Sequence, residues 1–553
     1  MQQTSDNAIG VDRSHRRVIF ASSLGTIFEW YDFYLYGALS AIISRQFFSG
    51  VDETTGFIFA LLAFAAGFFV RPFGAIVFGR LGDLVGRKHT FLITIVLMGA
   101  STALVGLLPS YESIGVLAPI ILIALRLLQG LALGGEYGGA AVYVAEHAPQ
   151  GKRGLYTSWI QTTATLGLFL SLLVILGCRL AFGENFETWG WRIPFLLSTI
   201  LLGISVYIRL QLQESPAFLQ IKEEGRLAKR PLTEAFGNRA NLRLVLLALF
   251  GATAGQAVVW YGGQFYALFF LEKMLQVEAA SANLIIAAAL LIGTPFFVIF
   301  GALSDRIGRK PIIMGGCVLA ALTYFPTFKT ITHAANPALE RAVSTAPVSV
   351  VADPDACSLQ FDPVGKQTFR RSCDVAKSAL AKAGVPYTNI EAPTGSIAEV
   401  RIGAGAEAIV LRSFEGMTLG SIEFKAEAAA FGKSLRTALN EAGYPAKADM
   451  SAVNYPLVIA LCVWLVLLVT MVYGPIAAWL VEIFPTHIRY TSMSLPYHLG
   501  NGWFGGFLPV TSFAIVAATG DIYAGLWYPV VVALITALIG TLFLHDPYRT
   551  KID

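Results

Sequence analysis

The chain has few charged residues for its length. Lys, Arg, Asp and Glu make up 14% of its 553 residues, whereas hydrophobic residues make up 55%. Soluble domains carry about 25% charged residues. A soluble protein of this composition could not cover its surface with polar groups, so lipid is its expected solvent. The shortage of charge therefore predicts an integral membrane protein.

The sequence also lacks the marks of several other classes. The net charge is only +4 and forms no basic stripe, so no nucleic-acid partner is expected. No phosphate-binding loop is present, which argues against ATP as an energy source. The five cysteines form no CxxC or Cys/His pattern, and no nucleophile elbow occurs. We therefore expect no enzyme, no metal site and no cofactor.

Long apolar runs recur along the chain, each near the roughly 20 residues that cross a bilayer. They predict twelve transmembrane helices, at 18–43, 56–78, 91–108, 115–145, 155–181, 191–210, 243–271, 281–303, 311–328, 453–481, 491–518 and 523–544. Lys and Arg gather in the N-terminal tail and after every even-numbered run. The alternate connections hold little more than Arg45, Arg179 and Lys273. This bias predicts that both termini are cytoplasmic.

One segment, residues 332–452, contains no membrane-crossing run and is expected to be extracytoplasmic. Helical patterns at 366–383 and 422–442 each end in Ala-Gly-X-Pro, a helix stop signal. Short β-rich runs at 348–351 and 408–411 flank them. The pattern predicts a small α+β domain that can bind an external ligand or protein. In an oxidising compartment Cys357 and Cys373 either form a disulfide or remain free thiols.

The two halves of the chain repeat each other. Gly79-Arg80-Leu81-Gly82-Asp83-Leu84-Val85-Gly86-Arg87-Lys88 matches Gly301-Ala302-Leu303-Ser304-Asp305-Arg306-Ile307-Gly308-Arg309-Lys310. Glu146, followed by Pro149 and Arg153, likewise matches Glu482, followed by Pro485 and Arg489. Removing the segment at 332–452 brings these two pairs into register. The chain is therefore predicted to be a duplicated six-helix unit with a domain inserted in the second copy.

These motifs resemble the major facilitator superfamily, whose signature is the loop between the second and third helices of each half. The run from Arg126 to Glu136 resembles the superfamily's motif in the fourth helix. Within the superfamily, the sequence Gly25-Thr26-Ile27-Phe28-Glu29-Trp30-Tyr31-Asp32-Phe33 resembles the first helix of the metabolite:proton symporters. The resemblance covers 18–331 and 453–546 and implies two pseudo-symmetric six-helix bundles. The expected domains are tail 1–17, first bundle 18–210, linker 211–242, spans seven to nine 243–331, insert 332–452, spans ten to twelve 453–546 and tail 547–553.

Charged residues inside the predicted helices are the first candidates for function, because charge in a membrane is expensive. Glu29 lies about 11 residues into the first helix, roughly 16 Å deep. Asp32 is on the same face, and Arg126 lies at a similar depth in the fourth helix with Gln129 beside it. These residues either couple protons to a substrate or form a permanent ion pair between helices.

Other polar residues are candidates for the substrate site. Arg71 either faces the central cavity or reaches back to the cytoplasmic interface. Polar and aromatic side chains in spans seven and eleven either contact substrate or bond helix to helix. They are Tyr261, Gln264, Tyr497, His498 and Asn501.

A last group of charges lies at the predicted cytoplasmic helix ends. The resemblance implies that they latch the two halves together in the outward-open state. They are Asp83, Arg87, Glu146 and Arg153 in the first half and Asp305, Arg309, Glu482 and Arg489 in the second.

Taken with the resemblance, these features predict a monomeric transporter in the inner membrane that imports a small polar metabolite with protons. Arg126 favours an organic anion such as a carboxylate, and a zwitterion such as proline or betaine is the alternative. A sensor or receptor that uses the insert to bind a ligand or partner is the other reading.

Overall fold

The computed structural model describes residues 13–49, 66–358 and 369–549. Ten helical stretches within these residues are long and apolar enough to cross a membrane. Two further helices precede them, α1 (Arg13–Phe47) and α3 (Arg71–Leu84). Together they give the predicted twelve. Their described ends lie within a few residues of the predicted ones, the largest of these differences being at α16, which continues past Pro326 to Ala335. The predicted start of the second span, at 56, lies outside the described residues.

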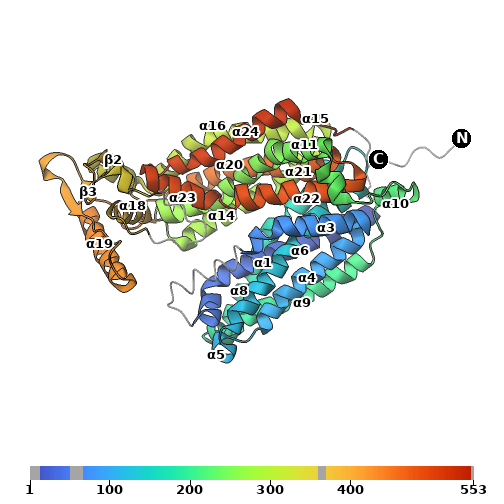
Figure 1. The fold of residues 1–553 in the computed structure, drawn as a ribbon, viewed down its shortest axis with the longest axis horizontal. Coiled ribbons are helices and arrows are strands. Elements are labelled where there is room, and N and C mark those ends of the chain that lie inside the picture. The colour runs from blue at the N-terminus through green and yellow to red at the C-terminus, as the bar shows by residue number, and fades with distance from the viewer. Residues whose placement is uncertain (1–12, 50–65, 359–368, 550–553) are drawn as a thin grey trace.

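The helices form two bundles that lie side by side (Figure 1). The first bundle consists of α1, α3, α4 (Arg87–Leu107), α6 (Leu117–His147), α7 (Arg153–Gln161), α8 (Thr163–Phe182) and α9 (Arg192–Leu210). Short segments lie in its connections, namely α5 (Tyr111–Ile114), η1 (Phe186–Gly190), α10 (Pro216–Glu223) and η2 (Thr233–Gly237).

The second bundle contains two helices that π-helical turns interrupt, a feature common at functional sites. Its seventh span runs through α11 (Arg239–Ala248), η3 (Leu249–Thr253), α12 (Ala254–Tyr261), η4 (Gly262–Tyr266), α13 (Ala267–Phe269) and η5 (Phe270–Met274). The eleventh span follows η8 (Thr486–Ile488) and runs through α22 (Arg489–Leu499), η9 (Gly500–Gly505) and α23 (Leu508–Thr519). The others are α14 (Ala279–Gly293), α15 (Pro295–Ile307), α16 (Arg309–Ala335), α20 (Tyr455–Tyr473), α21 (Ile476–Ile483) and, after η10 (Ala524–Leu526), α24 (Trp527–Phe543).

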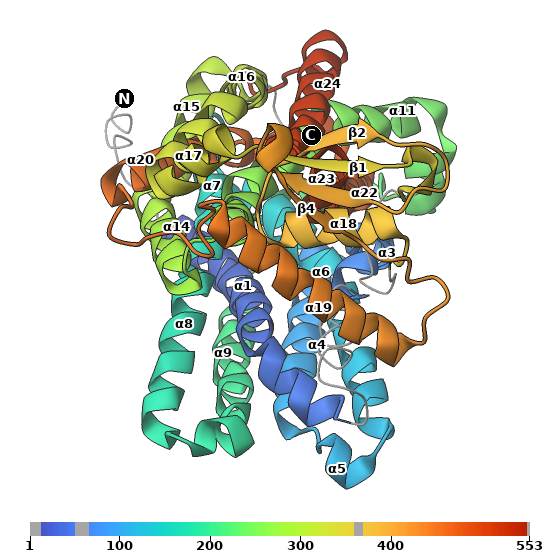
Figure 2. The ribbon, with the colours of Figure 1, turned by 90° about the vertical axis from the view of Figure 1, so that its left-hand side faces the viewer.

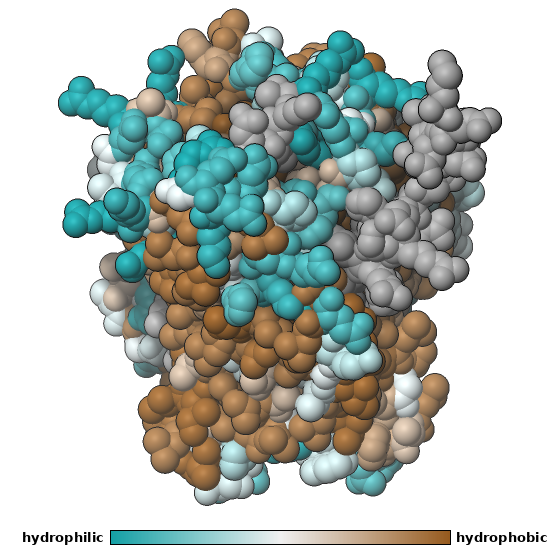
Figure 3. Space-filling model, turned by 90° about the vertical axis from the view of Figure 1, so that its right-hand side faces the viewer, coloured by the Kyte–Doolittle hydropathy of each residue, from teal (hydrophilic) through white to brown (hydrophobic). Residues whose placement is uncertain are grey.

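Apolar side chains cover much of the outside of the bundles. Leu107, Leu173, Leu284 and Leu542 are each more than 60% exposed. Figure 3, which faces the end of the molecule opposite the insert, shows a broad hydrophobic area, with polar residues gathered above it. Lipid is the solvent that such a surface requires.

The insert is an α+β unit. Its sheet has the order β2-β1-β3-β4, in which β1 (Val348–Ala352) pairs in parallel with β2 (Thr388–Glu391) and antiparallel with β3 (Glu399–Ile402), which pairs with β4 (Ile409–Arg412). The helices are α17 (Pro337–Thr345), α18 (Ser372–Lys382) and α19 (Ser421–Glu441), with the 3-10 turns η6 (Pro354–Ala356) and η7 (Gly405–Glu407). Cys357 and Cys373 form a disulfide.

The insert packs on one end of the second bundle, and α10 lies at the other end of the molecule (Figure 1). The backbone N–H of Tyr387 donates to Gly520 O, 2.9 Å away, at the end of α23. Ala448 N donates to Gln276 O at 3.0 Å. Gly384, at φ 69°, lies so close to the seventh span that a Cβ there would be 2.3 Å from Met274 O. These contacts fix the insert to the ends of spans seven and eleven.

Candidate functional site

The first group of buried polar residues, the central network, joins α1, α4 and α6. Arg126 Nη1 lies 3.2 Å from Asp32 Oδ2 and also donates to Gln129 Oε1. Gln129 Nε2 donates to Asp32 Oδ2 and, at 2.8 Å, to Thr102 Oγ1. The guanidinium lies 4.1 Å from the centre of the Tyr36 ring. Arg126 and Asp32 are 5% and 2% exposed. An ion pair held this far from water needs each of these contacts to offset its lost hydration.

A small cavity, about 10 Å³ in volume, lies beside the central network. That volume is about one water-sized sphere. Asp32 Oδ1 has no hydrogen-bond partner among the described residues. This oxygen can therefore accept a further hydrogen bond. The cavity is lined by Asp32, Gly67, Phe68, Arg71, Arg126, Gln129, Gly130 and Leu133. Arg71 therefore faces the cavity, the first of the two positions that the sequence left open for it.

The structure brings Asp32, Arg126 and Gln129 together. Glu29 lies one turn before Asp32 in α1, but its side chain falls outside the described part of the structure. Its part in proton coupling therefore stays a prediction.

A stack of three tyrosines fills the space between the bundles. The rings of Tyr137, from α6, and Tyr497, from α22, are parallel with centres 3.7 Å apart. Tyr473, from α20, contacts both, and its hydroxyl lies 2.6 Å from that of Tyr497. Tyr137 and Tyr473 occupy corresponding positions of the two repeats. The stack therefore sits where the two halves meet.

The remaining predicted substrate residues lie in spans seven and eleven. Asn501 exchanges amide hydrogen bonds of 3.1 and 3.2 Å with Gln256. Tyr261 packs on Gly505 so closely that a Cβ there would be 2.3 Å from its ring. Gln264 is buried in η4. His498 is also buried, and its Nε2 has no hydrogen-bond partner among the described residues.

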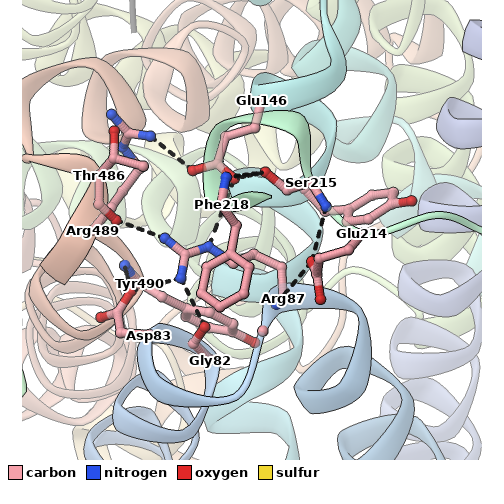
Figure 4. A network of polar contacts seen from close by, with 12 residues as sticks. Gly82, Asp83, Arg87, Glu146, Glu214, Ser215, Phe218, Thr486, Arg489 and Tyr490 are labelled. Carbon is pink, nitrogen blue, oxygen red and sulfur yellow. Dashed lines mark hydrogen bonds and ion pairs between the residues drawn. The ribbon is translucent and has the colours of Figure 1, made fainter. Parts of the chain in front are cut away.

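A cluster of charges, shown in Figure 4, crosses between the bundles near α10. Arg87 Nη1 lies 3.0 Å from Asp83 Oδ1, and Arg87 Nε lies 3.6 Å from Glu146 Oε2. Glu146 Oε1 in turn accepts from Arg489 Nη1 of the second bundle at 2.7 Å. Arg87 also donates to Thr486 O at 2.6 Å. We call Asp83, Arg87, Glu146 and Arg489 the first charge cluster.

The second charge cluster repeats this arrangement with the halves exchanged. Arg309 Nη1 lies 2.8 Å from Asp305 Oδ1, and Arg309 Nη2 donates to Glu482 Oε1 at 2.8 Å. Glu482 Oε1 lies 3.4 Å from Arg153 Nη1 of the first bundle. All eight predicted latch residues thus meet in two related clusters.

Each cluster also caps a helix of the opposite half. Asp83 accepts backbone hydrogen bonds from Tyr490 N and Thr491 N, in the first turn of α22. Asp305 accepts in the same way, at 2.8 Å each, from the N–H groups of Gly154 and Leu155 in α7. A carboxylate at a helix N-terminus meets free N–H groups and a favourable dipole. The bundles are therefore closed against each other at this end.

Some members of these networks were not among the predicted site residues. Glu214 accepts from the backbone N–H groups of Arg87 and Lys88, and Asp546 accepts from that of Lys310. These two carboxylates cap the helices that follow the repeated motif. The sequence repeat could have predicted these two carboxylates, because each one follows the last helix of its half.

A buried pair formed by Glu136 and Arg209 was also missed. Arg209 Nη1 donates to Phe91 O at 2.7 Å, and its Nη2 pairs with Glu136 Oε1. Thr94 Oγ1 donates to the other carboxylate oxygen at 2.8 Å. Since this pair lies within the first bundle, we assign it to packing of α4, α6 and α9. No group of three or more His, Cys, Asp or Glu residues suited to a metal occurs in the described ranges.

Comparison with known proteins agrees with this architecture. Residues 18–243 match the family profile of the sugar (and other) transporters, and residues 140–350 match that of the MFS/sugar transport proteins. In structure, the chain resembles the major facilitator superfamily proton:xylose symporter XylE bound to 6-bromo-6-deoxy-D-glucose. The TM-score is 0.60 at 15% identity, with 98% of each chain covered.

Several relatives from Escherichia coli (strain K12) are similar in sequence. The proline/betaine transporter is 36% identical over 57% of this chain, and the match covers 65% of that relative, slightly less than two thirds. The shikimate transporter is 36% identical over 57% of this chain and 72% of its own length. The inner membrane metabolite transport protein YhjE is 31% identical over 73% of this chain and 93% of its own length. The chain therefore belongs to the major facilitator superfamily of membrane transporters, among its metabolite transporters.

Proposed function

We propose that the protein is a secondary transporter that imports a small organic metabolite together with protons by alternating access. The observation that carries the proposal is the central network, in which Asp32 and Arg126 pair beside a cavity inside a membrane helix bundle. A buried ion pair is costly, and in membranes such pairs mark ion and substrate pathways.

The coupling follows from competition for Arg126. A carboxylate group on the solute can replace Asp32 there, because a guanidinium binds carboxylates through paired hydrogen bonds. Asp32 would then be a buried carboxylate without its cation, a state that favours protonation. Solute and proton therefore bind together. Release of the solute inside lets Asp32 lose its proton and return to Arg126. Glu29, on the same face of α1, is the second candidate for the proton.

The charge clusters supply the conformational step. Both join the two bundles at the end near α10, so the described state is closed there. Rocking of the bundles must break Asp83 and Asp305 from the helices they cap in the opposite half. We infer that this end is cytoplasmic, as the distribution of Lys and Arg predicts. The insert then lies outside the inner membrane, both termini lie inside, and the disulfide is in an oxidising compartment. We expect the transporter to act as a monomer.

Arg71 and Arg126 both line the small cavity of the central network. Two cations there favour an organic anion as the solute. A zwitterion is the second candidate, because two of the relatives are named as transporters of proline and betaine or of glycine betaine, proline, ectoine and pipecolic acid. A panel of radiolabelled carboxylates, shikimate, proline and betaine, tested in cells with and without a proton ionophore, separates the two. Uptake of every compound unaffected by the ionophore would refute proton coupling.

The sensor reading is tested by deleting residues 337–453, which runs from α17 to the residue before the cap of α20. A transporter with an accessory domain keeps uptake after this deletion. If the protein is instead a receptor that signals through the insert, the wild type itself shows no uptake.

A further inference from the structure

A large cleft lies between the insert and the second bundle, away from the central network. Its volume is about 970 Å³, enough for a small organic molecule. One side is formed by α19, which runs past α18 across the end of the molecule in Figure 2. The floor is formed by the insert-facing ends of spans seven and eleven, through residues such as Phe269, Pro509 and Phe513.

The walls of the cleft are aromatic. Phe424 and Phe431 of α19 line it from one side, and Phe513 of α23 lines it from below, in edge contact with Phe269 at 6.0 Å. Tyr444 also lines the cleft, and burial raises the pKa of its hydroxyl to about 12. The aromatic side chains of the cleft are therefore uncharged at neutral pH. They offer a surface for an apolar or aromatic body.

The charged residues that line the described part of the cleft are all of one sign. They are Lys382 of α18 and Lys433 and Arg436 of α19. Among the lining residues that the structure describes, none is Asp or Glu. All three cations are exposed, and none has an ion pair within the described part of the chain. A concave surface with one sign of charge concentrates ions of the other sign.

Two helix faces lead from the cleft toward the tyrosine stack. On the eleventh span, Phe513 and Pro509 line the cleft, and steps of four residues lead on to Gly505 and Asn501. The same step on the seventh span leads from Phe269 to Phe265 and Tyr261. The two faces meet where Tyr261 packs on Gly505. Asn501 lies eight residues below Pro509, roughly 12 Å.

We propose that this cleft is an outer binding site for the transported organic anion. Its carboxylate binds at Lys433, Arg436 and Lys382, and its apolar body packs on the phenylalanines. From there the two helix faces lead it to the gap between the bundles. This inference rests on the proposed import of an organic anion, with the insert on the outer side.

Benzoate is a suitable probe, because it joins a carboxylate to an aromatic ring, and benzyl alcohol is its neutral counterpart. Binding to the purified full-length protein is measured by equilibrium dialysis. Replacing both Lys433→Gln and Arg436→Gln should weaken benzoate binding by roughly tenfold or more, since two charged contacts are lost. Lys425→Gln, an exposed cation on α19 that does not line the cleft, is the matched control and should bind as the wild type does.

The variant Arg126→Gln separates the cleft from the central network. It should keep benzoate binding while losing coupled uptake. Undiminished binding in the double variant, equal binding of benzyl alcohol, or loss of all binding in Arg126→Gln would overturn the outer site. Displacement of benzoate by a low mole fraction of phosphatidylglycerol would also overturn it, by showing a lipid headgroup site. Failure of the wild type to couple uptake to protons would instead refute the proposed function.

A transport measurement completes the test. The double variant should raise the concentration of transported solute needed for half-maximal uptake and leave the maximal rate unchanged. An unchanged half-saturation would contradict a site that the solute occupies on its way in.

Discussion

The proposed coupling of protons to solute depends on Asp32. This residue is the carboxylate that pairs with Arg126, and its second oxygen has no partner among the described residues. Asp32→Asn keeps the size of the side chain and removes its exchangeable proton. We therefore expect this variant to exchange solute across a membrane but not to concentrate it.

The size of the effect follows from the proton gradient. One pH unit is worth about 1.4 kcal/mol per proton, so one-to-one coupling supports about tenfold accumulation. Proteoliposomes with an imposed gradient should show this accumulation in the wild type and lose it in Asp32→Asn, while counterflow persists. Glu187→Gln removes an exposed carboxylate paired with Arg45 and serves as the control. Full accumulation in Asp32→Asn would show that another group carries the coupled proton. Glu29→Gln would then be the next variant to test.

Cys357 and Cys373 are the residues that close a loop in the insert. They are 16 positions apart, and a loop of about this length is stabilised by about 3 kcal/mol when it is cross-linked. Cys373→Ser should therefore make the insert sensitive to protease at a lower temperature, with the bundles unaffected. Cys178→Ser, at a free cysteine in α8, is the control. Equal protease resistance in both variants would show that the bridge contributes little.

At the scale of elements, the closed end depends on carboxylates that cap helices of the other bundle. Asp305→Asn weakens the capping of α7 and leaves Arg309 with one carboxylate fewer. Removing one partner of a buried ion pair costs about 3–5 kcal/mol. We expect the bundles to favour the state open near α10, and transport to fall sharply while membrane insertion persists.

Asp83→Asn should behave alike, because its cluster repeats the arrangement. Alkylation of cysteines placed between α7 and α15 measures the opening. Arg80→Gln, an exposed charge of the same motif, should leave accessibility unchanged. If Asp83→Asn failed to insert into the membrane, the role of this charge would instead be to set the membrane topology.

Close contact between α7 and α15 provides a second test at this scale. A Cβ at Gly301 would lie 2.4 Å from Ser158 Cβ and 2.6 Å from Gly154 O. Gly301→Ala should therefore push the bundles apart, at a cost typical of overpacking, about 1–3 kcal/mol. Gly177→Ala, where nothing lies within 4 Å, is the control. Spectroscopic distances across this end that match in both variants would argue against the contact.

The elements that the sequence predicted well are those with a strong local signal. The twelve spans follow from hydropathy, and α19 follows from its apolar period and its Gly-X-Pro ending. The strands β2 and β3 were not predicted. β2 is exposed at every position, so it has no alternating apolar pattern, and its place depends on pairing with β1. The π-helical turns were not predicted either.

The site shows the same limit. Asp32 and Arg126 could be placed together because each lies deep in an apolar run, where charge is exceptional, and Gln129 could be added because it lies three residues from Arg126 on the same helix face. The capping of α22 by Asp83 could not be foreseen, since its partners are backbone N–H groups some 400 residues away in the chain. The direction of Arg71 likewise depended on the packing of α3.

At the scale of the whole molecule, the insert and the charge clusters occupy opposite ends. The proposed orientation therefore predicts where each can be labelled. Ser434→Cys on α19 and Gln220→Cys on α10 are both exposed positions, and the free native cysteines are buried. A thiol reagent that cannot cross membranes should label Ser434→Cys in intact cells and Gln220→Cys only after permeabilisation. The reverse pattern would invert the topology.

The most direct test of the account measures protons that move with the solute. Cells or proteoliposomes that contain the wild type are placed in weakly buffered medium, and the pH outside is recorded as the transported solute is added. The account predicts that the medium becomes more alkaline as uptake begins, and that Asp32→Asn abolishes the change while exchange continues. Solute uptake with no change in external pH would contradict it.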